Sequence, residues 1–171
     1  MKLPSTHEQF VLHWGEMGQK WGINRTTAQV HALLLCSEDP LHAQEISESL
    51  EIARSNISTA IRELQGWELI HTVPIKGDRK DYFTAEKSVW EVLSLIARKR
   101  VEREILPTLT FLRDLKEQEG SRGGSFGKLL QDFIDIFESC IRFYERLASF
   151  PKGVTKRILK LDQKLKKLVG D

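Results

Sequence analysis

Residues 41–85 constrain the fold of this chain more than any other stretch, because two short helical patterns and two β-rich runs follow one another there. The stretch reads LHAQEISESLEIARSNISTAIRELQGWELIHTVPIKGDRKDYFTA. A first helix is expected to begin at His42, with Glu45 three residues later as in half of a capping box. Ile46 and Leu50 form its apolar stripe, and residues 51–53 suit the turn between two steeply crossing helices.

The second helix, expected over about residues 54–65, has one apolar face and one polar face. Ile57, Ala60, Ile61 and Leu64 recur at helical spacing and are predicted to be buried. The polar face has short hydrogen-bonding side chains near its N-terminus and a longer Arg further along: Arg54, Ser55, Asn56, Ser58, Thr59 and Arg62. Such a surface suits a recognition helix in the DNA major groove, although an ordinary solvated helix has a similar one.

Two strand patterns follow, over residues 69–75 and 81–84, on either side of a charged turn. Gly77 and Asp78 give the backbone the freedom to turn, and Lys76, Arg79 and Lys80 place cations at the tip. A basic hairpin directly after a polar-faced helix is typical of a wing that contacts phosphate or enters the minor groove. The order of elements therefore predicts a winged helix-turn-helix.

Two runs carry more specific motifs: GINRTTAQVHALLLCSEDPL over residues 22–41 and NISTAIRELQGWELIHTVPIKGDRKDYFTAEKSVW over residues 56–90. Both resemble the GbsR-like branch of the MarR-type winged-helix transcriptional regulators. The resemblance covers roughly residues 8–112. Two positions depart from its pattern: Ala53 replaces the usual Ser cap, for which Ser55 is expected to compensate, and Glu68 replaces a Gly, whose left-handed role Gly66 is expected to take.

The pattern and the resemblance together predict a mainly α fold with a small β-wing, of the α+β class. Residues 1–85 are expected to form the DNA-binding domain, including an N-terminal helix over residues 5–20. A capping box at Thr26 and Gln29 is expected to open the next helix. Residues 86–171 are expected to form a helical dimerisation and effector region.

The C-terminal half contains three further helical patterns. The first begins at Glu86, restarts at Pro107 and ends before a linker over residues 120–125. Its predicted buried stripe is Val89, Trp90, Leu93, Ile96, Val101 and Ile105. The second is a heptad seam of Phe126, Leu130, Phe133, Phe137, Cys140, Tyr144 and Leu147, and the third repeats the alternation from Val154 to Leu168. Apolar seams outside a small core predict a homodimer.

Composition excludes several classes of function. No run of about 18 apolar residues is present, so no membrane partner is expected, and the N-terminus lacks an apolar signal region, which predicts a cytoplasmic protein. Cys36 and Cys140 lie in apolar helical patterns and are expected to be buried free thiols. Neither zinc-ligand spacing nor a catalytic triad or phosphate-binding loop occurs, so no metal, no cofactor and no enzymatic activity are expected.

Charge leaves two functional hypotheses open. Residues 1–85 contain 8 Lys/Arg and 11 Asp/Glu, a net charge of −3, while residues 86–171 have 18 and 13, a net charge of +5. The first hypothesis is a homodimeric repressor that binds double-stranded DNA through residues 54–62 and the cations at 76, 79 and 80. The alternative is a winged-helix protein–protein adaptor without sequence-specific DNA binding, which the net charge of −3 mildly favours.

The resemblance also implies control by a small-molecule effector, since some members of the GbsR-like group respond to quaternary amines. Aromatic side chains can hold such cations by cation–π attraction. The candidate cage consists of Trp14, Trp90, Phe126, Phe133 and Phe137, although each of these residues fits a core position equally well.

Overall fold

The structure, a computed structural model, describes residues 4–120 and 124–149, which divide into two compact units. The first unit extends to Ala97 and the second begins at Arg98. The predicted final helix, from Val154 to Leu168, lies outside the described residues. The predicted boundary at residue 85 separates a DNA-binding domain from a dimerisation and effector region. This assignment of functions stays a prediction.

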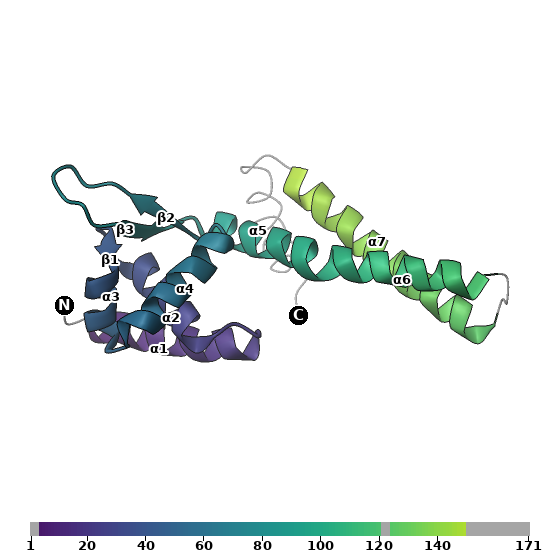
Figure 1. Ribbon diagram of the computed structural model, residues 1–171, viewed down its shortest axis with the longest axis horizontal. Helices are drawn as coiled ribbons and strands as arrows, with labels where there is room; N and C mark the ends of the chain where they lie inside the picture. Colours follow the sequence, from purple (N-terminus) through teal and green to yellow (C-terminus); the bar gives the residue numbers. More distant parts are fainter. Residues whose placement is uncertain (1–3, 121–123, 150–171) are drawn as a thin grey trace, which may run out of the picture. The chain divides into compact units, whose positions relative to one another are not determined.

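The first unit is a helical core with a small antiparallel sheet (Figure 1). Its elements are α1 (Ser5–Lys20), α2 (Arg25–Cys36), β1 (Leu41–His42), α3 (Ala43–Leu50), α4 (Arg54–Gly66), β2 (Ile70–Val73), β3 (Tyr82–Ala85) and the greater part of α5 (Val89–Arg100). This is the predicted mainly α fold with a β-wing. The sheet has the strand order β1-β3-β2, and the predicted hairpin pairs Val73 with Tyr82 next to the loop.

Helix α2 lies at the centre of the first unit because nearly all of its circumference is covered. Val30, Ala32 and Leu33 are completely buried, and the remaining core includes residues of α1, α3, α4, α5 and the sheet. Helix α2 is capped by Asn24, whose Oδ1 accepts hydrogen bonds from the backbone N–H groups of Thr26 and Thr27. The capping box predicted at Thr26 is therefore wrong.

The carboxyl end of α2 is capped from a distant part of the sequence. Lys87 Nζ donates hydrogen bonds to the backbone oxygens of Leu34 and Ser37, both at 2.6 Å, and of Leu35 at 3.1 Å. A cation is well placed there because the last carbonyl groups of a helix lack partners and carry partial negative charge. Partial burial lowers the pKa of Lys87. This contact fixes the chain just after β3 against the core.

Two glycines let α1 approach α2 closely. A Cβ atom added to Gly18 would lie 2.5 Å from Ala28 Cβ, and one added to Gly15 would lie 2.7 Å from Gln29 Cγ. Real Cβ atoms do not approach so closely, so a larger residue at Gly18 must push the two helices apart.

We expect Gly18→Ala to reduce the free energy of unfolding by about 1–3 kcal/mol, because an added methyl group overpacks this contact. Ala28→Gly on its own should cost about 1 kcal/mol of helix propensity. Since Ala28→Gly removes the clashing methyl, the double variant should lose clearly less unfolding free energy than the two single variants lose in sum. Urea denaturation of all four proteins measures the coupling, and strictly additive costs would contradict the close contact.

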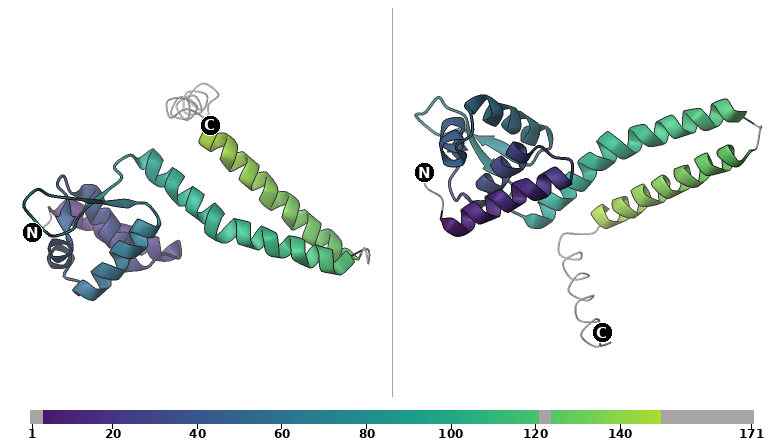
Figure 2. Two further views of the ribbon diagram at one scale, coloured as in Figure 1. Left: turned by 45° about the horizontal axis from the view of Figure 1, so that its top comes forward. Right: turned by 90° about the horizontal axis from the view of Figure 1, so that it is seen from below.

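The second unit begins at Arg98, within α5, and continues through a π-helical turn, η1 (Val101–Ile105), and α6 (Leu106–Glu119), to α7 (Ser125–Ser149). Pro107 occupies the first turn of α6, where its missing N–H is tolerated, so the predicted restart is confirmed. Helices α6 and α7 lie side by side and antiparallel (Figure 2). Leu109 of α6 is buried, as are Leu130 and Ile134 of α7.

Two predictions about buried residues are wrong. In α5 the buried residue is Val92, whereas Val89 is 73% exposed and Leu93 is 54% exposed. In α7 Leu130 of the predicted heptad seam is buried, together with Ile134, which the prediction did not include, whereas Cys140, expected to be a buried thiol, is exposed. Helices with apolar residues on several sides do not specify by periodicity which side meets the partner.

Candidate nucleic-acid interface

Helix α4 is held firmly by its apolar face, which leaves its polar face to solvent. Ile57 is completely buried, and Ala60, Ile61 and Leu64 are at most 5% exposed, as predicted. Thr27 Oγ1 donates a hydrogen bond of 2.7 Å to Glu63 Oε2, which ties α4 to α2. All six residues predicted for recognition are exposed: Arg54, Ser55, Asn56, Ser58, Thr59 and Arg62.

The two ends of α4 differ from the sequence prediction. Ala53 is the N-cap residue and no side chain caps the helix, so Ser55 does not compensate for it. At the other end Glu68 itself has a positive φ of 60°, while Gly66 is still helical. The prediction that Gly66 takes the left-handed conformation is therefore wrong. The chain reverses at Glu68, and Leu69 beyond it is buried and leads into the wing.

A groove of about 880 Å³ lies between α4 and the wing. It brings together five of the predicted residues, namely Arg54, Ser58, Arg62, Arg79 and Lys80. The other four, Ser55, Asn56, Thr59 and Lys76, are exposed but do not line it. The groove thus gathers four cations from two separate elements, although the net charge of residues 1–85 is −3.

The sequence prediction missed several residues of the groove. His42, Gln44, Gln65 and Thr72 all line it. Gln65 Nε2 donates a hydrogen bond of 3.1 Å to Thr72 Oγ1, which connects α4 to β2. For His42 the signal was present, because its capping role was predicted, but its position beside the wing depends on β1, a strand that the sequence did not reveal.

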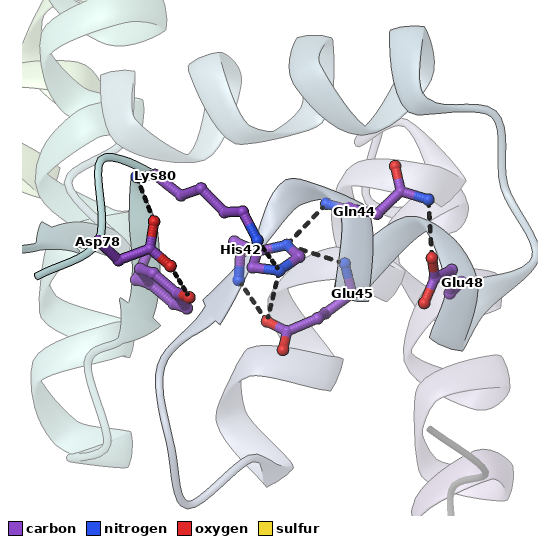
Figure 3. A network of polar contacts seen from close by, with 7 residues as sticks. His42, Gln44, Glu45, Glu48, Asp78 and Lys80 are labelled. Carbon is purple, nitrogen blue, oxygen red and sulfur yellow. Dashed lines mark hydrogen bonds and ion pairs between the residues drawn. The ribbon is translucent and has the colours of Figure 1, made fainter. Parts of the chain in front are cut away.

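Asp78 organises the tip of the wing. Its Oδ1 accepts a 2.9 Å hydrogen bond from the backbone N–H of Lys80, and its Oδ2 accepts a 2.8 Å bond from the Tyr82 hydroxyl (Figure 3). The hydrogen bond from the Lys80 backbone has the largest effect in lowering the pKa of Asp78, and the hydrogen bond from Tyr82 has the next largest. The hydrogen bond to the Asp78 carboxylate in turn raises the pKa of Tyr82. Gly77, with a φ of 90°, supplies the left-handed conformation that this turn requires.

The wing is also joined to α3 through His42. Residue His42 pairs with Tyr82 in the sheet, and the two rings meet edge to face with centroids 5.3 Å apart. His42 Nδ1 accepts hydrogen bonds of 3.2 Å from the backbone N–H groups of Gln44 and Glu45, while Glu45 Oε2 accepts the backbone N–H of His42 at 2.9 Å (Figure 3). The predicted half of a capping box is in fact a complete one.

The residues of the predicted aromatic cage are divided between the units. Trp14 and Trp90 belong to the first unit, and Phe126, Phe133 and Phe137 belong to α7 in the second. Trp14 packs against the core and also lines a small cavity of about 30 Å³ with Trp21, Trp67 and His31. The predicted cage stays a prediction.

His31 is the one buried titratable group beside that cavity. It is 3% exposed, and among the described residues its Nε2 has no hydrogen-bond partner. Burial lowers its pKa from 6.5 to about 4, because the charged imidazolium loses its hydration. The ring is therefore neutral near pH 7.

The described residues, 4–120 and 124–149, include no helix long and apolar enough to cross a membrane. Within the same residues no group of three or more His, Cys, Asp or Glu side chains is placed to hold a metal ion.

Comparison with known proteins finds similar sequences and structures among transcriptional regulators. Residues 21–81 match the model of the MarR family, and they span α2, α3, α4, β2 and the loop of the wing, ending just before β3. YvaV of Bacillus subtilis (strain 168), named for a role as an HTH-type transcriptional regulator, is 19% identical over 157 residues, which cover 84% of this chain and 88% of YvaV. The crystal structure of a transcriptional regulator superposes with a TM-score of 0.70 at 18% identity, covering 82% of this chain and 94% of that one. At so low a sequence identity, this structural similarity shows a shared fold and nothing more.

Proposed function

We propose that this chain is a MarR-type winged-helix transcriptional regulator, and that it is a homodimeric repressor that reads one double-stranded DNA operator in the cytoplasm. The observation that carries the proposal is the groove between α4 and the wing, which gathers Arg54, Arg62, Arg79 and Lys80 beside an exposed polar helix face. The motifs of residues 22–41 and 56–90 further support its assignment to the GbsR-like branch.

In this proposal α4 enters the major groove and the wing contacts the adjacent backbone or minor groove. The short side chains of Ser55, Asn56 and Thr59 let the helix approach the base edges, and Asn and Arg can each make paired hydrogen bonds to a base. Lys76, Arg79 and Lys80 supply phosphate contacts, which position the protein without reading sequence.

A homodimer is supported by the apolar residues that the second unit leaves exposed. Phe111 is 60% exposed, Ile136 58% and Phe143 65% in the single chain. Large exposed apolar residues of this kind are typical of a surface that binds a partner. A two-fold dimer presents two recognition helices to half-sites about one DNA turn apart, roughly 34 Å.

The proposal is tested by selecting bound fragments from genomic DNA and measuring their affinity again at two salt concentrations. Recovery of a palindromic site that is still preferred at the higher salt concentration supports the proposal. Absent binding, or equal binding of all fragments that disappears as salt rises, would instead support the adaptor, which the net charge of −3 over residues 1–85 mildly favours.

We expect Asn56→Ala and Arg62→Ala each to weaken operator binding by about 1–3 kcal/mol and to relax the preference at one base pair, because a base contact is lost. Gln19→Ala and Lys20→Ala, at exposed positions of α1, are the matched controls. Fluorescence anisotropy with the operator and with single-base variants measures both effects. Unchanged affinity and preference in both variants would remove these two residues from the site.

Control by a small ligand is a separate part of the proposal. It rests on the resemblance to the GbsR-like branch and on the aromatic residues Trp14, Trp90, Phe126, Phe133 and Phe137. Titration calorimetry with choline and betaine tests it, and the absence of heat together with unchanged DNA affinity would exclude these ligands.

A further inference from the structure

His42 and Lys80 present two hydrogen-bond donors to each other inside the groove. Lys80 Nζ lies 3.3 Å from His42 Nε2 (Figure 3). Since His42 Nδ1 accepts two backbone N–H groups, it carries no proton, and the proton of the neutral ring is therefore on Nε2. An ammonium and an imidazole N–H can only donate, so this short contact is not a hydrogen bond between them.

The neighbouring acceptors do not resolve this pairing. Glu45 Oε2 lies 3.7 Å from His42 Nε2, beyond hydrogen-bond distance, and is already bonded to the backbone N–H of His42 at 2.9 Å. Asp78 is occupied by the backbone of Lys80 and by the hydroxyl of Tyr82. Two converging donors at this distance fit one oxygen atom of an external anion.

The course of bound DNA supplies that anion. This step rests on the proposed function: with α4 in the major groove and the wing at the neighbouring minor groove, the sugar-phosphate strand between the two grooves must cross the protein between α4 and the wing. His42 and Lys80 both line that groove, together with Arg54 and Arg79. We propose that His42 Nε2–H and Lys80 Nζ jointly bind one backbone phosphate of the operator.

This assignment gives His42 two simultaneous roles. Nδ1 caps α3, and Nε2, the other ring nitrogen, lies beside Lys80 Nζ in the groove. The edge-to-face contact with Tyr82 and the strand pairing of the two residues hold the ring in this orientation. The phosphate would thus bridge α3 and the wing, and its position would be set before DNA arrives.

The variant that separates the two roles is His42→Asn. Asn is a good N-cap, so α3 should keep its cap and the thermal midpoint should stay close to that of the wild type, but its amide is too short to reach the phosphate. We expect operator affinity to fall about tenfold, as for the loss of a hydrogen bond to a charged group. Lys80→Gln should also lower the slope of log affinity against log salt by about 0.9. His13→Asn and Lys20→Gln, at exposed positions of α1, should leave both quantities unchanged.

A shared phosphate is identified by neutralising single backbone phosphates as methylphosphonates along the strand that crosses the groove. We expect one position at which the wild type loses about tenfold in affinity, while His42→Asn and Lys80→Gln lose less than twofold because the contact is already missing. The proposal would be overturned if His42→Asn and Lys80→Gln were insensitive to neutralisation at two different phosphates. Full operator affinity of His42→Asn would also overturn it.

Nitrogen NMR of the wild-type imidazoles provides a test that does not depend on how a variant folds. The proposal requires the Nε2–H form of His42 in the free protein and a change in its Nε2 resonance on adding the operator. A ring protonated on Nδ1 would overturn it. Wild-type protein that binds no duplex at all contradicts the proposed function itself. Normal operator binding that neither shifts the His42 Nε2 resonance nor weakens in His42→Asn contradicts this inference alone.

Discussion

Lowering the pH from 7 to 4 is expected to reduce the free energy of unfolding by about 3 kcal/mol through His31 alone. In the unfolded chain this imidazole binds a proton as the pH falls below about 6.5, whereas burial lowers the pKa of the folded state to about 4. Between these two values the unfolded state binds more protons than the folded one. Stability therefore rises with pH through this window and is fully present above about 6.5.

The effect of His31 is isolated by comparing pH profiles, since the carboxylates of the chain titrate in the same range. His31→Leu places an apolar side chain of similar size in the cavity wall and removes the group that binds the proton. We expect the wild type to lose about 3 kcal/mol more than His31→Leu between pH 7 and pH 4, measured by urea denaturation. His13→Leu, at an exposed position of α1, should keep the wild-type profile. Parallel profiles for the wild type and His31→Leu would contradict a buried neutral imidazole.

Replacing Ile57 with Ala should cost about 2–5 kcal/mol of unfolding free energy, because it leaves a cavity under α4. Ile57 is completely buried, in one cluster with Val30, Leu33 and Ile46. Ile75→Ala makes the same chemical change in the wing, where the side chain is 39% exposed, and should stay within about 0.5 kcal/mol of the wild type.

The Ile57 variant also connects stability to function. Its loss of operator affinity should be small at low temperature, where the protein is still folded, because the side chain faces away from the polar surface of α4. Arg62→Ala should show the reverse, with nearly normal stability and weakened operator binding. Chemical denaturation and anisotropy on the same samples measure both properties. Equal stability of Ile57→Ala and Ile75→Ala would contradict the buried position of Ile57.

The winged helix-turn-helix follows from the sequence because its signals are local. The spacing of Ile57, Ala60, Ile61 and Leu64 determines which side of α4 is buried, and an amphipathic helix with a single apolar stripe can pack in only one way. Consequently, the exposed face from Arg54 to Arg62 was also predictable. The turn at Gly77 and Asp78 was predictable for the same reason, since few residues permit that backbone conformation.

Where the sequence leaves several faces apolar, only tertiary packing decides which one is buried. In α5 the sequence favours Val89 and Leu93, but Val92 is buried in the core, and Leu95 and Ile96 pack against it. The same holds for α7, in which Ile134 rather than Phe133 is covered. Backbone strain behaves similarly: Glu68 adopts a positive φ although Gly66 is two residues away, because the chain must turn there for Leu69 to reach the core.

The sequence by itself determined the polar helix face and the cationic turn that are proposed to contact DNA. Tertiary structure alone decided that His42 belongs with them. Its neighbours in the sequence mark it as a helix cap, and 38 residues separate it from Lys80. The two meet because β1, only two residues long, pairs with β3 and brings the start of α3 beside the wing. Strand pairing between distant segments depends on the whole fold, and so short a strand has no periodicity from which it could be predicted.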